Sequence, residues 1–343
     1  MTLPASAPVD SGMDVAQVVA VPTATQDPRR VKRDLVIGAA VVVVLLALPF
    51  FASAALATAL TRILALALLA VSLDLLVGVG GLPSLGHAAP FGVGAYAAGI
   101  TARELTPWAP VQLLAAVLAG AVLAIGIGWL VVRARGTYLL MLTLAFAEIF
   151  HVLAIRWTSV TGGDNGLVGI PALTFVPGGD PVRLAGYRYW YVLVVSLVFF
   201  LLLLAVSRSA FGRSLRGVRD NEDRMSSLGY STFAVKYKAF VISGAVAGAA
   251  GALYVAQARF VSPADLAFEV SALALLAVVI GGRGSLWGAV LGAALVFYIR
   301  DEIGPELGGR GPLLLGAVFI AAVFLLPRGF AGLRLPRRRG ATR

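Results

Sequence analysis

Cysteine is absent from the 343-residue chain, and histidine occurs only twice. Without thiols there is no disulfide framework and no thiolate metal site, and two histidines are too few for a histidine-rich metal centre. Charged residues are scarce as well, at 13% of the sequence, whereas soluble domains carry roughly 25%. The composition therefore predicts no metal and no cofactor, and it argues against an ordinary soluble fold.

Long apolar runs take the place of the missing charge. Hydrophobic residues make up 59% of the chain, and the mean hydropathy is +0.90. Apolar runs near twenty residues recur, which is the length that crosses a ~30 Å hydrocarbon core. The predicted spans are 35–51, 57–79, 85–101, 109–132, 137–156, 189–207, 238–257, 269–281, 285–299 and 311–327. We therefore predict an all-α integral membrane protein with about ten transmembrane helices. The spans at 85–101 and 269–281 are short enough to be broken or partly re-entrant.

Lys and Arg are distributed unevenly between the two sides that ten spans define. The chain carries 28 Lys and Arg against 17 Asp and Glu, and most of the 28 fall on the side of the N-terminus. Cytoplasmic loops hold an excess of Lys and Arg, so both termini are predicted to be cytoplasmic. This bias accounts for the net charge of +11 without a nucleic-acid partner.

A single transmembrane domain, 35–327, is predicted between two polar tails. Residues 1–34 are expected to be a disordered cytoplasmic tail, and 328–343 a basic cytoplasmic one. The basic residues before 35, followed by Ala52-Ser53-Ala54, also resemble a secretory signal. That leader would be unusually long, so no cleavage is expected.

Two hydrophilic loops interrupt the domain. Loop 158–187 is predicted to be external, and loop 208–237, rich in Arg, is predicted to be cytoplasmic. Within 208–237, Asp220 or Asn221 is placed to cap a short helix, two acids follow where the helix dipole favours them, and Gly229 is placed to end it in the left-handed conformation. Such a helix is too short to be stable alone. It is either a helical turn in a solvated loop or a surface for a partner protein.

This segment is similar to the coupling segment of ABC-importer permeases, where an acid–Ala–Ala–three residues–Gly pattern docks into a groove of the ATPase subunit. Asp223 and Gly229 hold the acid and glycine positions, while Arg224 and Met225 replace the two alanines. The resemblance implies an ATPase-coupling surface. Met225 and Leu228 are three residues apart and are expected to share an apolar face. The predicted residues of the coupling surface are Arg219, Asp220, Asn221, Glu222, Asp223, Arg224, Met225, Leu228 and Gly229.

Other stretches resemble one branch of these permeases, the branched-chain amino acid permeases of the LivM type. They are the Ser-Leu-Gly-His-Ala signature within 81–96 and the stretches at 135–148, 161–171, 247–254 and 281–285. The resemblance covers about 35–330. It implies a permease subunit of an ABC importer that moves branched-chain or other small amino acids across the bacterial inner membrane into the cytoplasm. Urea or short amides are the alternative substrates.

The same resemblance implies several partners besides membrane lipid. A second related permease would complete the pore, ATP-binding subunits would dock on the cytoplasmic side, and a soluble binding protein would deliver substrate outside. The sequence contains no Gly-x4-Gly-Lys-Ser/Thr phosphate loop. ATP is therefore expected to be hydrolysed by separate subunits, and the chain is predicted not to be an enzyme.

Polar residues inside the predicted spans are costly in lipid and must face protein or water. Asp74, near the predicted cytoplasmic end of its span, is expected to reach water. Glu148 and His151 share a helical face and form either a structural pair or part of the substrate path. His87 is expected to serve in packing and hydrogen bonding. The candidates for the translocation path are Ser84, His87, Thr143, Glu148 and His151.

Glycines recur at helical spacing in two spans. Gly244 with Gly248, and Gly288 with Gly292, are small-xxx-small pairs that either allow close helix packing or reflect the general abundance of glycine in membrane helices. A Gly-Gly-x-x-Ser-Leu sequence occurs at both 80–85 and 281–286. Such matching interruptions point toward a translocation path.

Two further function classes remain open from the residues alone. In an ion-coupled secondary transporter, Asp74, Glu148 and His151 would form a proton relay, but the short helix in 208–237 would then have no purpose. A membrane enzyme would need a nucleophile–base or metal cluster, and the scattered acids and histidines suggest none. No catalytic residue is therefore predicted.

Overall fold

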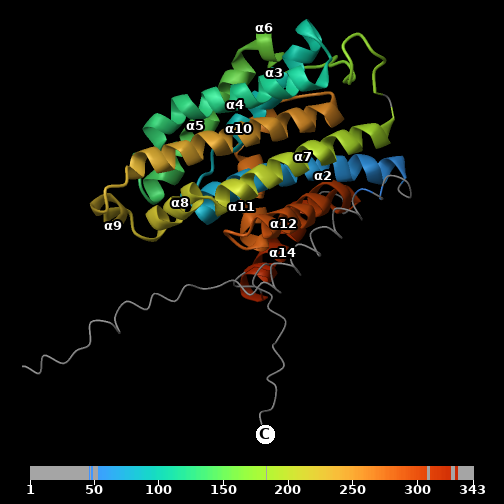
Figure 1. Ribbon diagram of the computed structural model, residues 1–343. Coiled ribbons are helices and arrows are strands. Elements are labelled where there is room, and N and C mark those ends of the chain that lie inside the picture. The colour runs from blue at the N-terminus through green and yellow to red at the C-terminus, as the bar shows by residue number, and fades with distance from the viewer. Residues whose placement is uncertain are drawn as a thin grey trace, which may run out of the picture. The chain divides into compact units, whose positions relative to one another are not determined.

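The computed structural model (Figure 1) describes residues 46, 48, 53–182, 184–306, 310–325 and 329–330. The chain divides into two units, Met1–Ala47 and Leu48–Arg343, and the second contains every element from α2 to α14. The predicted tail 1–34, the predicted tail 328–343 apart from Gly329 and Phe330, and the predicted span 35–51 apart from Leu46 and Leu48 lie outside the described residues.

The described part of the chain is helical and contains no β-strand. Five of its helices are long and apolar enough to cross a membrane. They are α2 (Ala54–Asp74) with its π-helical end η2 (Leu75–Val79), α4 (Ala109–Val131), α5 (Thr137–Arg156), α7 (Ala185–Arg208) and α10 (Thr232–Ala258). The other long elements are α3 (Ala88–Ile100) with η3 (Thr101–Leu105), α11 (Phe268–Gly281), α12 (Leu286–Tyr298) with η6 (Ile299–Ile303), and α14 (Gly311–Leu325). An all-α membrane fold is confirmed, and the count of ten spans stays a prediction.

The remaining elements are short. They are α6 (Thr158–Thr161), η4 (Gly163–Asn165), α8 (Ala210–Asp220), α9 (Glu222–Ser227), η5 (Pro263–Leu266) and α13 (Gly304–Glu306). Of these, α8 is a helix that the sequence did not lead us to expect. Ser209 caps it by accepting from the Gly212 N–H, and Leu215 and Val218 bury one face. The arginines on its other face give the segment the composition of a loop.

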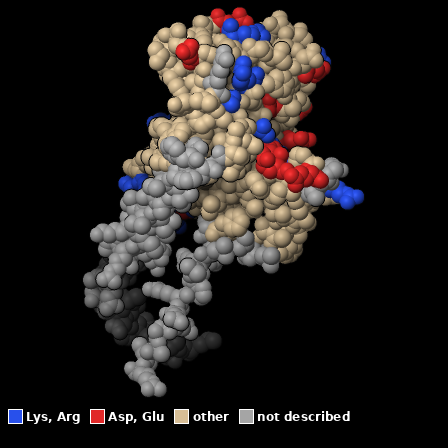
Figure 2. Space-filling view, turned by 90° about the vertical axis from the view of Figure 1, so that its right-hand side faces the viewer, with Lys and Arg blue, Asp and Glu red and all other residues tan. Residues whose placement is uncertain are grey.

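Helices α2 and α10 form the centre of the structure. Their apolar windows are 83% and 72% buried inside the protein, against 28% for α4, 22% for α5 and 33% for α7. Helix α10 packs against α2, α3 and α4, side by side with α4 and α7 in Figure 1. The outer helices therefore present most of their surface away from this chain, and much of the described surface on the face shown in Figure 2 is free of charged side chains.

Glycines bring α3, α4 and α10 into backbone contact. A Cβ added to Gly248 would overlap the carbonyl oxygen of Ala116, and one on Gly94 would lie 2.6 Å from the Gly248 carbonyl oxygen. A Cβ on Gly120 would lie 2.5 Å from the carbonyl oxygen of Gly244. The pair Gly244 and Gly248 is thus confirmed as a close-packing site, because any larger side chain would push the helices apart.

The second glycine pair joins α11 to α12. A Cβ on Gly292 would overlap the Ala277 carbonyl oxygen, and one on Gly281 would overlap that of Gly288. The two short helices are therefore a tight hairpin, which explains how apolar segments of 14 and 13 residues pack stably beside the longer spans.

The helix connections gather at two opposite ends, as alternating spans require. At one end, Arg135 between α4 and α5 contacts Glu222 of α9, and the loop after α11 bonds to the end of α2. At the other end, Leu167 pairs with Val261, and Trp108 with Thr174. Figure 1 shows α6 and α9 far apart, at opposite ends of the helices. Loops 158–187 and 208–237 therefore lie on opposite sides, and which side is cytoplasmic stays a prediction.

Candidate functional site

The candidate site is the end of the bundle that carries α9, and α9 forms where the sequence predicts it. The side chain of Asn221 accepts a hydrogen bond from the Arg224 N–H at 2.8 Å and caps the first turn. Gly229, at φ +84°, ends the helix, and the Tyr230 N–H closes it onto the Met225 carbonyl at 3.1 Å. A Cβ on Gly229 would meet nothing within 4 Å. Glycine is therefore needed there for its backbone conformation rather than for space.

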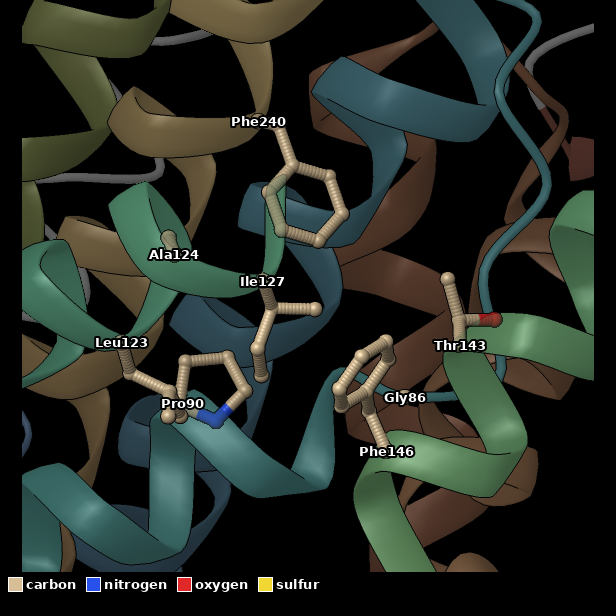
Figure 3. Close-up of a pocket in the computed structure, with 8 residues that line it drawn as sticks. All are labelled: Gly86, Pro90, Leu123, Ala124, Ile127, Thr143, Phe146 and Phe240. Atoms are coloured by element: carbon tan, nitrogen blue, oxygen red, sulfur yellow. The ribbon is translucent and has the colours of Figure 1, made fainter. Parts of the chain in front are cut away.

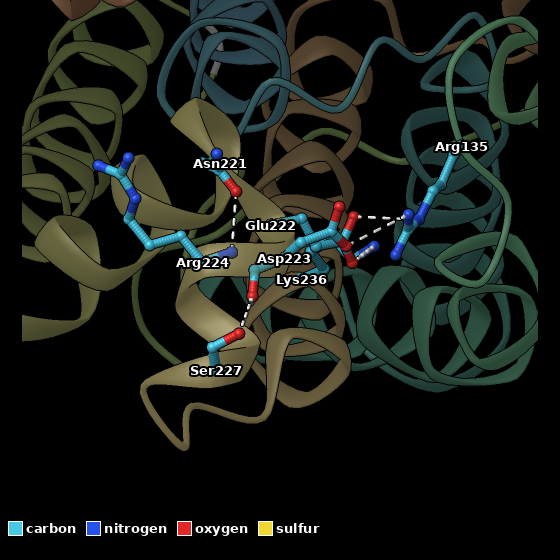
Figure 4. Close-up of polar contacts among 7 residues, drawn as sticks. All are labelled: Arg135, Asn221, Glu222, Asp223, Arg224, Ser227 and Lys236. Carbon is cyan, nitrogen blue, oxygen red and sulfur yellow. Dashed lines mark hydrogen bonds and ion pairs between the residues drawn. The ribbon is translucent and has the colours of Figure 1, made fainter. Parts of the chain in front are cut away.

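Ion pairs hold the first turn of α9 against two other elements (Figure 4). The Lys236 Nζ of α10 lies 2.7 Å from Glu222 Oε1, and the Arg135 Nε lies 3.3 Å from Glu222 Oε2. Arg135 also reaches the Asp223 carboxylate at 3.8 Å. We call these four residues the α9 clamp. It ties the candidate coupling helix to the α4–α5 connection and to the start of α10.

Glu222 is the centre of the α9 clamp. Burial alone would raise the pKa of Glu222. The hydrogen bond and charge of Lys236, together with the charge of Arg135, outweigh this effect, so the pKa is lowered from its ordinary value. The Lys236 side chain is only 6% exposed, and a buried ammonium without its partner is strongly unfavourable. Glu222 therefore stays ionised at neutral pH, and Lys236 depends on it. The only hint of this pairing in the sequence is the position of Lys236 at the start of an apolar run, 14 residues after Glu222.

The apolar face predicted for α9 is divided in the structure. Met225 packs inward on Gly217 of α8, where an added Cβ would lie 2.8 Å from its Sδ. Leu228 is 66% exposed and Tyr230 is 48% exposed. The prediction that Met225 and Leu228 share one face is therefore wrong: one anchors α9 to the protein, and the other faces outward with Tyr230.

Arg219 and Asp220 belong to α8 rather than to the helix on which we predicted the coupling surface. Arg219 pairs with Asp220 at 2.9 Å and donates to the carbonyl oxygen of Gly78 at 2.7 Å. Arg224 lies exposed on α9. The predicted coupling residues are thus spread over two consecutive helices at one end of the bundle.

His87 is fully enclosed at the start of α3. Its Nε2 lies 3.1 Å from the Ser72 hydroxyl and 3.0 Å from the Ser243 hydroxyl. The Ala88 N–H, directly after His87, donates to the Ser271 hydroxyl at 2.7 Å. The imidazole therefore joins α2, α3 and α10 through hydroxyl groups. This agrees with the predicted packing role, and a role for His87 on the path stays a prediction.

Ser84 and Thr143 are also buried, at 3% and 2% exposure. Ser84 accepts from the Gly86 N–H at 3.3 Å, and Thr143 accepts from the Leu85 N–H at 3.1 Å. Thr143 borders a small apolar pocket (Figure 3). The pocket is lined by Gly86, Pro90, Leu123, Ala124, Ile127, Thr143, Phe146 and Phe240. Its free volume is about 10 Å³, room for roughly one water, so this conformation leaves no space there for an amino acid.

Glu148 and His151 differ from the other path candidates because they face outward. Their side chains pair at 3.3 Å, yet they are 54% and 23% exposed. Glu148 is eleven residues from the start of α5, or roughly 17 Å along the axis, which is near the middle of a ~30 Å core. The two side chains therefore share a helical face and pair on the outside of this chain, and a place for them on the substrate path stays a prediction.

Asp74 does not reach water, contrary to the expectation from sequence. It is 0% exposed, and its Oδ1 accepts a hydrogen bond from the Gly284 N–H at 2.8 Å. The loop after α11 folds over the end of α2, which apolar patterning cannot reveal. Among the described residues, no group of three or more His, Cys, Asp or Glu side chains is close enough to hold a metal ion.

Comparison with known proteins adds a family to this geometry. The family model for permease components of branched-chain amino acid transport systems matches residues 55–326. The high-affinity branched-chain amino acid transport system permease protein LivM of Escherichia coli K12 is 31% identical over 336 residues, covering 91% of this chain and 78% of that protein. BraD, a high-affinity branched-chain amino acid permease of Pseudomonas aeruginosa, is 27% identical over 78% of this chain and 91% of its own length. LsrC, an autoinducer 2 import permease of Escherichia coli DH10B, is 28% identical over 56% of this chain and 54% of its own. No solved structure matches significantly.

Proposed function

The chain belongs to the family of permease components of branched-chain amino acid transport systems, and from that premise we propose that it carries branched-chain or other small amino acids into the cytoplasm as one subunit of an ABC importer. Separate subunits hydrolyse the ATP, a second related permease completes the pore, and a soluble binding protein supplies substrate. The family and the apolar helices make it a multi-pass membrane protein.

One observation carries the ATP-driven part of this proposal: α9 is a short capped helix at the tip of the bundle, anchored at its base and apolar at its outer edge. The α9 clamp fixes its first turn, while Leu228 and Tyr230 remain exposed beyond it. A helix of six residues is not stable alone, so its order comes from these anchors. We propose that the ATPase subunit covers the exposed side of α9.

Replacing Gly229 by proline should detach the ATPase subunits and abolish ATP-driven leucine uptake. Proline fixes φ near −65°, which is incompatible with the +84° found at Gly229, so the end of α9 and the position of Leu228 must change. Co-purification of the ATPase subunits and uptake of labelled leucine into proteoliposomes measure the effect. Gly229→Asn is the matched control, because asparagine tolerates the left-handed region, and it should retain most of both activities. Unchanged co-purification and uptake in Gly229→Pro would refute the docking role of α9.

The ion-coupled alternative predicts a different energy source. Family membership favours the ABC importer. An ATPase-dead partner subunit should abolish uptake, whereas dissipating the proton gradient at constant ATP should leave it intact.

A second part of the proposal concerns the outer face of α5. Lipid is an unfavourable neighbour for an exposed Glu148 at mid-span, because carboxylates at that depth face protein or water. Tyr138, Met141 and Glu148 lie at helical spacing on the most exposed of the five long helices. We propose that this face lies toward the second permease and borders the translocation path.

Replacing Glu148 by leucine should lower leucine uptake about tenfold, which corresponds to a rise of ~1.4 kcal/mol in the activation barrier, without reducing the amount of assembled transporter. A lipid-facing position would instead tolerate or prefer leucine. Uptake by reconstituted transporter, normalised to assembled complex, measures the difference. Ile149→Leu on the same helix, where the side chain is 57% exposed, is the control and should match the wild type. Full activity of Glu148→Leu would place this face against lipid.

A further inference from the structure

The end of α2 leaves a backbone carbonyl without a helical donor. After η2, the Gly80 N–H bonds to the Leu75 carbonyl and the Leu82 N–H to that of Leu76. Leu82 is therefore not free to serve Gly78, and the next residue, Pro83, has no N–H. Orphan carbonyls at helix ends need another donor. Arg219 of α8 supplies it, with its Nη1 2.7 Å from the Gly78 oxygen.

The Arg219 side chain is fitted to this position. Gly81, at φ +65°, passes directly beneath it, so that a Cβ there would overlap Arg219 Cγ and lie 3.1 Å from its Cβ. Asp220 holds the guanidinium from the other side at 2.9 Å. Leu215, one turn earlier on α8, is fully buried and lies 3.3 Å from the Cβ position of Gly80. Helix α8 therefore sits on the break at the end of α2.

Gly78 meets a third element on its other side. A Cβ on Gly78 would overlap both Asp74 Oδ1 and the Gly284 nitrogen, and it would lie 2.6 Å from Gly284 Cα. Asp74 holds Gly284 by the 2.8 Å hydrogen bond. The two Gly-Gly interruptions of the sequence, after α2 and after α11, therefore come together at Gly78. A displacement of Gly78 would reach both of them.

The contacts of α9 explain why this meeting point matters. The α9 clamp connects α9 to the α4–α5 connection and to α10. Helix α8 is connected to α9 by the contact of Met225 with Gly217, and to α2 by the Arg219 hydrogen bond. We propose that the Arg219–Gly78 hydrogen bond is a joint that passes movement of α8 and α9 to the broken end of α2 and to the α11–α12 loop. Arg219 is a positioning residue for transport, and this inference rests on the proposed docking of the ATPase at α9.

Arg219→Gln in the complete reconstituted transporter, with both permeases, the ATPases and the binding protein, tests the joint. Leucine transported per ATP hydrolysed should fall about tenfold, as expected for the loss of one charge-assisted hydrogen bond. ATPase co-purification and hydrolysis should stay within about twofold of the wild type. Arg216→Gln is the matched control: Arg216 donates to the Ser207 carbonyl at 2.8 Å and so anchors α8 to α7 rather than to α2. Arg219→Lys, which keeps one donor, should give an intermediate ratio.

An unchanged ratio in Arg219→Gln, an equal loss in Arg216→Gln, or loss of the ATPases from Arg219→Gln would each overturn the joint. Hydrogen exchange of the same complexes gives a second measurement that also separates this inference from the proposed function. In the wild type, ATP should alter exchange in both 210–227 and 75–86; in Arg219→Gln the change should stay within 210–227. A change that still reaches 75–86 refutes the joint alone. No change in either segment of the wild type refutes the docking role of α9 as well.

Discussion

Replacing Gly248 by leucine is expected to leave almost no folded protein in the membrane. The first added carbon would overlap the Ala116 carbonyl oxygen and lie 3.2 Å from Gly120 Cα. Both neighbours are backbone of α4, so no side chain can rotate away. Overpacking a tight core typically costs about 1–3 kcal/mol, and here four carbons enter a backbone contact between α4 and the central helix α10. The expected loss is a large part of a total stability of about 5–15 kcal/mol.

Yield after detergent extraction and the melting temperature of the purified chain measure this effect. Gly126→Leu is the matched control, because Gly126 lies on α4 and a Cβ there would meet nothing within 4 Å. It should match the wild type in both measurements, and Gly248→Ala should fall between the two. A Gly248→Leu protein with wild-type yield and melting temperature would show that α4 and α10 do not approach as closely as the structure has them.

The positions of the long helices were predictable because a helix in lipid needs a continuous apolar run, which is visible in the local sequence. The predicted 137–156 coincides with α5, and 109–132 with α4 to within one residue. Helix α10 begins at Thr232 rather than 238, because Ser231 caps it and Lys236 is neutralised by a residue of another helix. Apolar patterning ends the predicted span at Lys238. Only the tertiary structure shows that the next lysine, Lys236, is paired with Glu222 and lies inside the helix.

Helix α8 had a signal that the arginines obscured. Phe211, Leu215 and Val218 follow the spacing of one helical face, and the structure buries Leu215 and Val218. The helical period of these apolar residues predicts α8, whereas the mean hydropathy of the segment does not.

The candidate site was predictable in its local half only. Asn221 and Gly229 act on residues within a few positions of themselves, so the cap and the end of α9 follow from spacing. Arg219 on Gly78 and Asp74 on Gly284 join residues 141 and 210 positions apart. Nothing in the pattern of either segment identifies its partner. The expectation that Asp74 reaches water was wrong for the same reason. The apolar pattern of α2 locates the span that contains Asp74, but it does not identify the loop after α11 that covers this carboxyl group.

Charge reversal at Glu222 is expected to release α9 and to lower ATP-driven leucine uptake by at least about a hundredfold. The Lys236 side chain is only 6% exposed, and leaving a buried charge without its partner costs ~3 kcal/mol or more. In Glu222→Lys, the nearly buried Lys236 ammonium faces a second ammonium, and Arg135 loses its main partner. Limited proteolysis at 221–231 measures the release without reference to transport. Leucine uptake by the reconstituted transporter measures its consequence.

Glu104→Lys is the control, since Glu104 belongs to an exposed ion pair with Arg103 at the end of α3, and such pairs contribute at most about 1 kcal/mol.

The lowered pKa of Glu222 adds a pH test. A carboxyl group whose folded pKa is depressed stabilises the fold above its unfolded value, near 4.5 for this group, and loses that contribution as the pH falls through the folded pKa. Proteolysis at 221–231 in the wild type should therefore be constant from neutral pH down to about 5 and rise only in stronger acid. A rise between pH 7 and 5, or a Glu222→Lys protein as resistant as Glu104→Lys, would mean that the α9 clamp does not hold α9 in place.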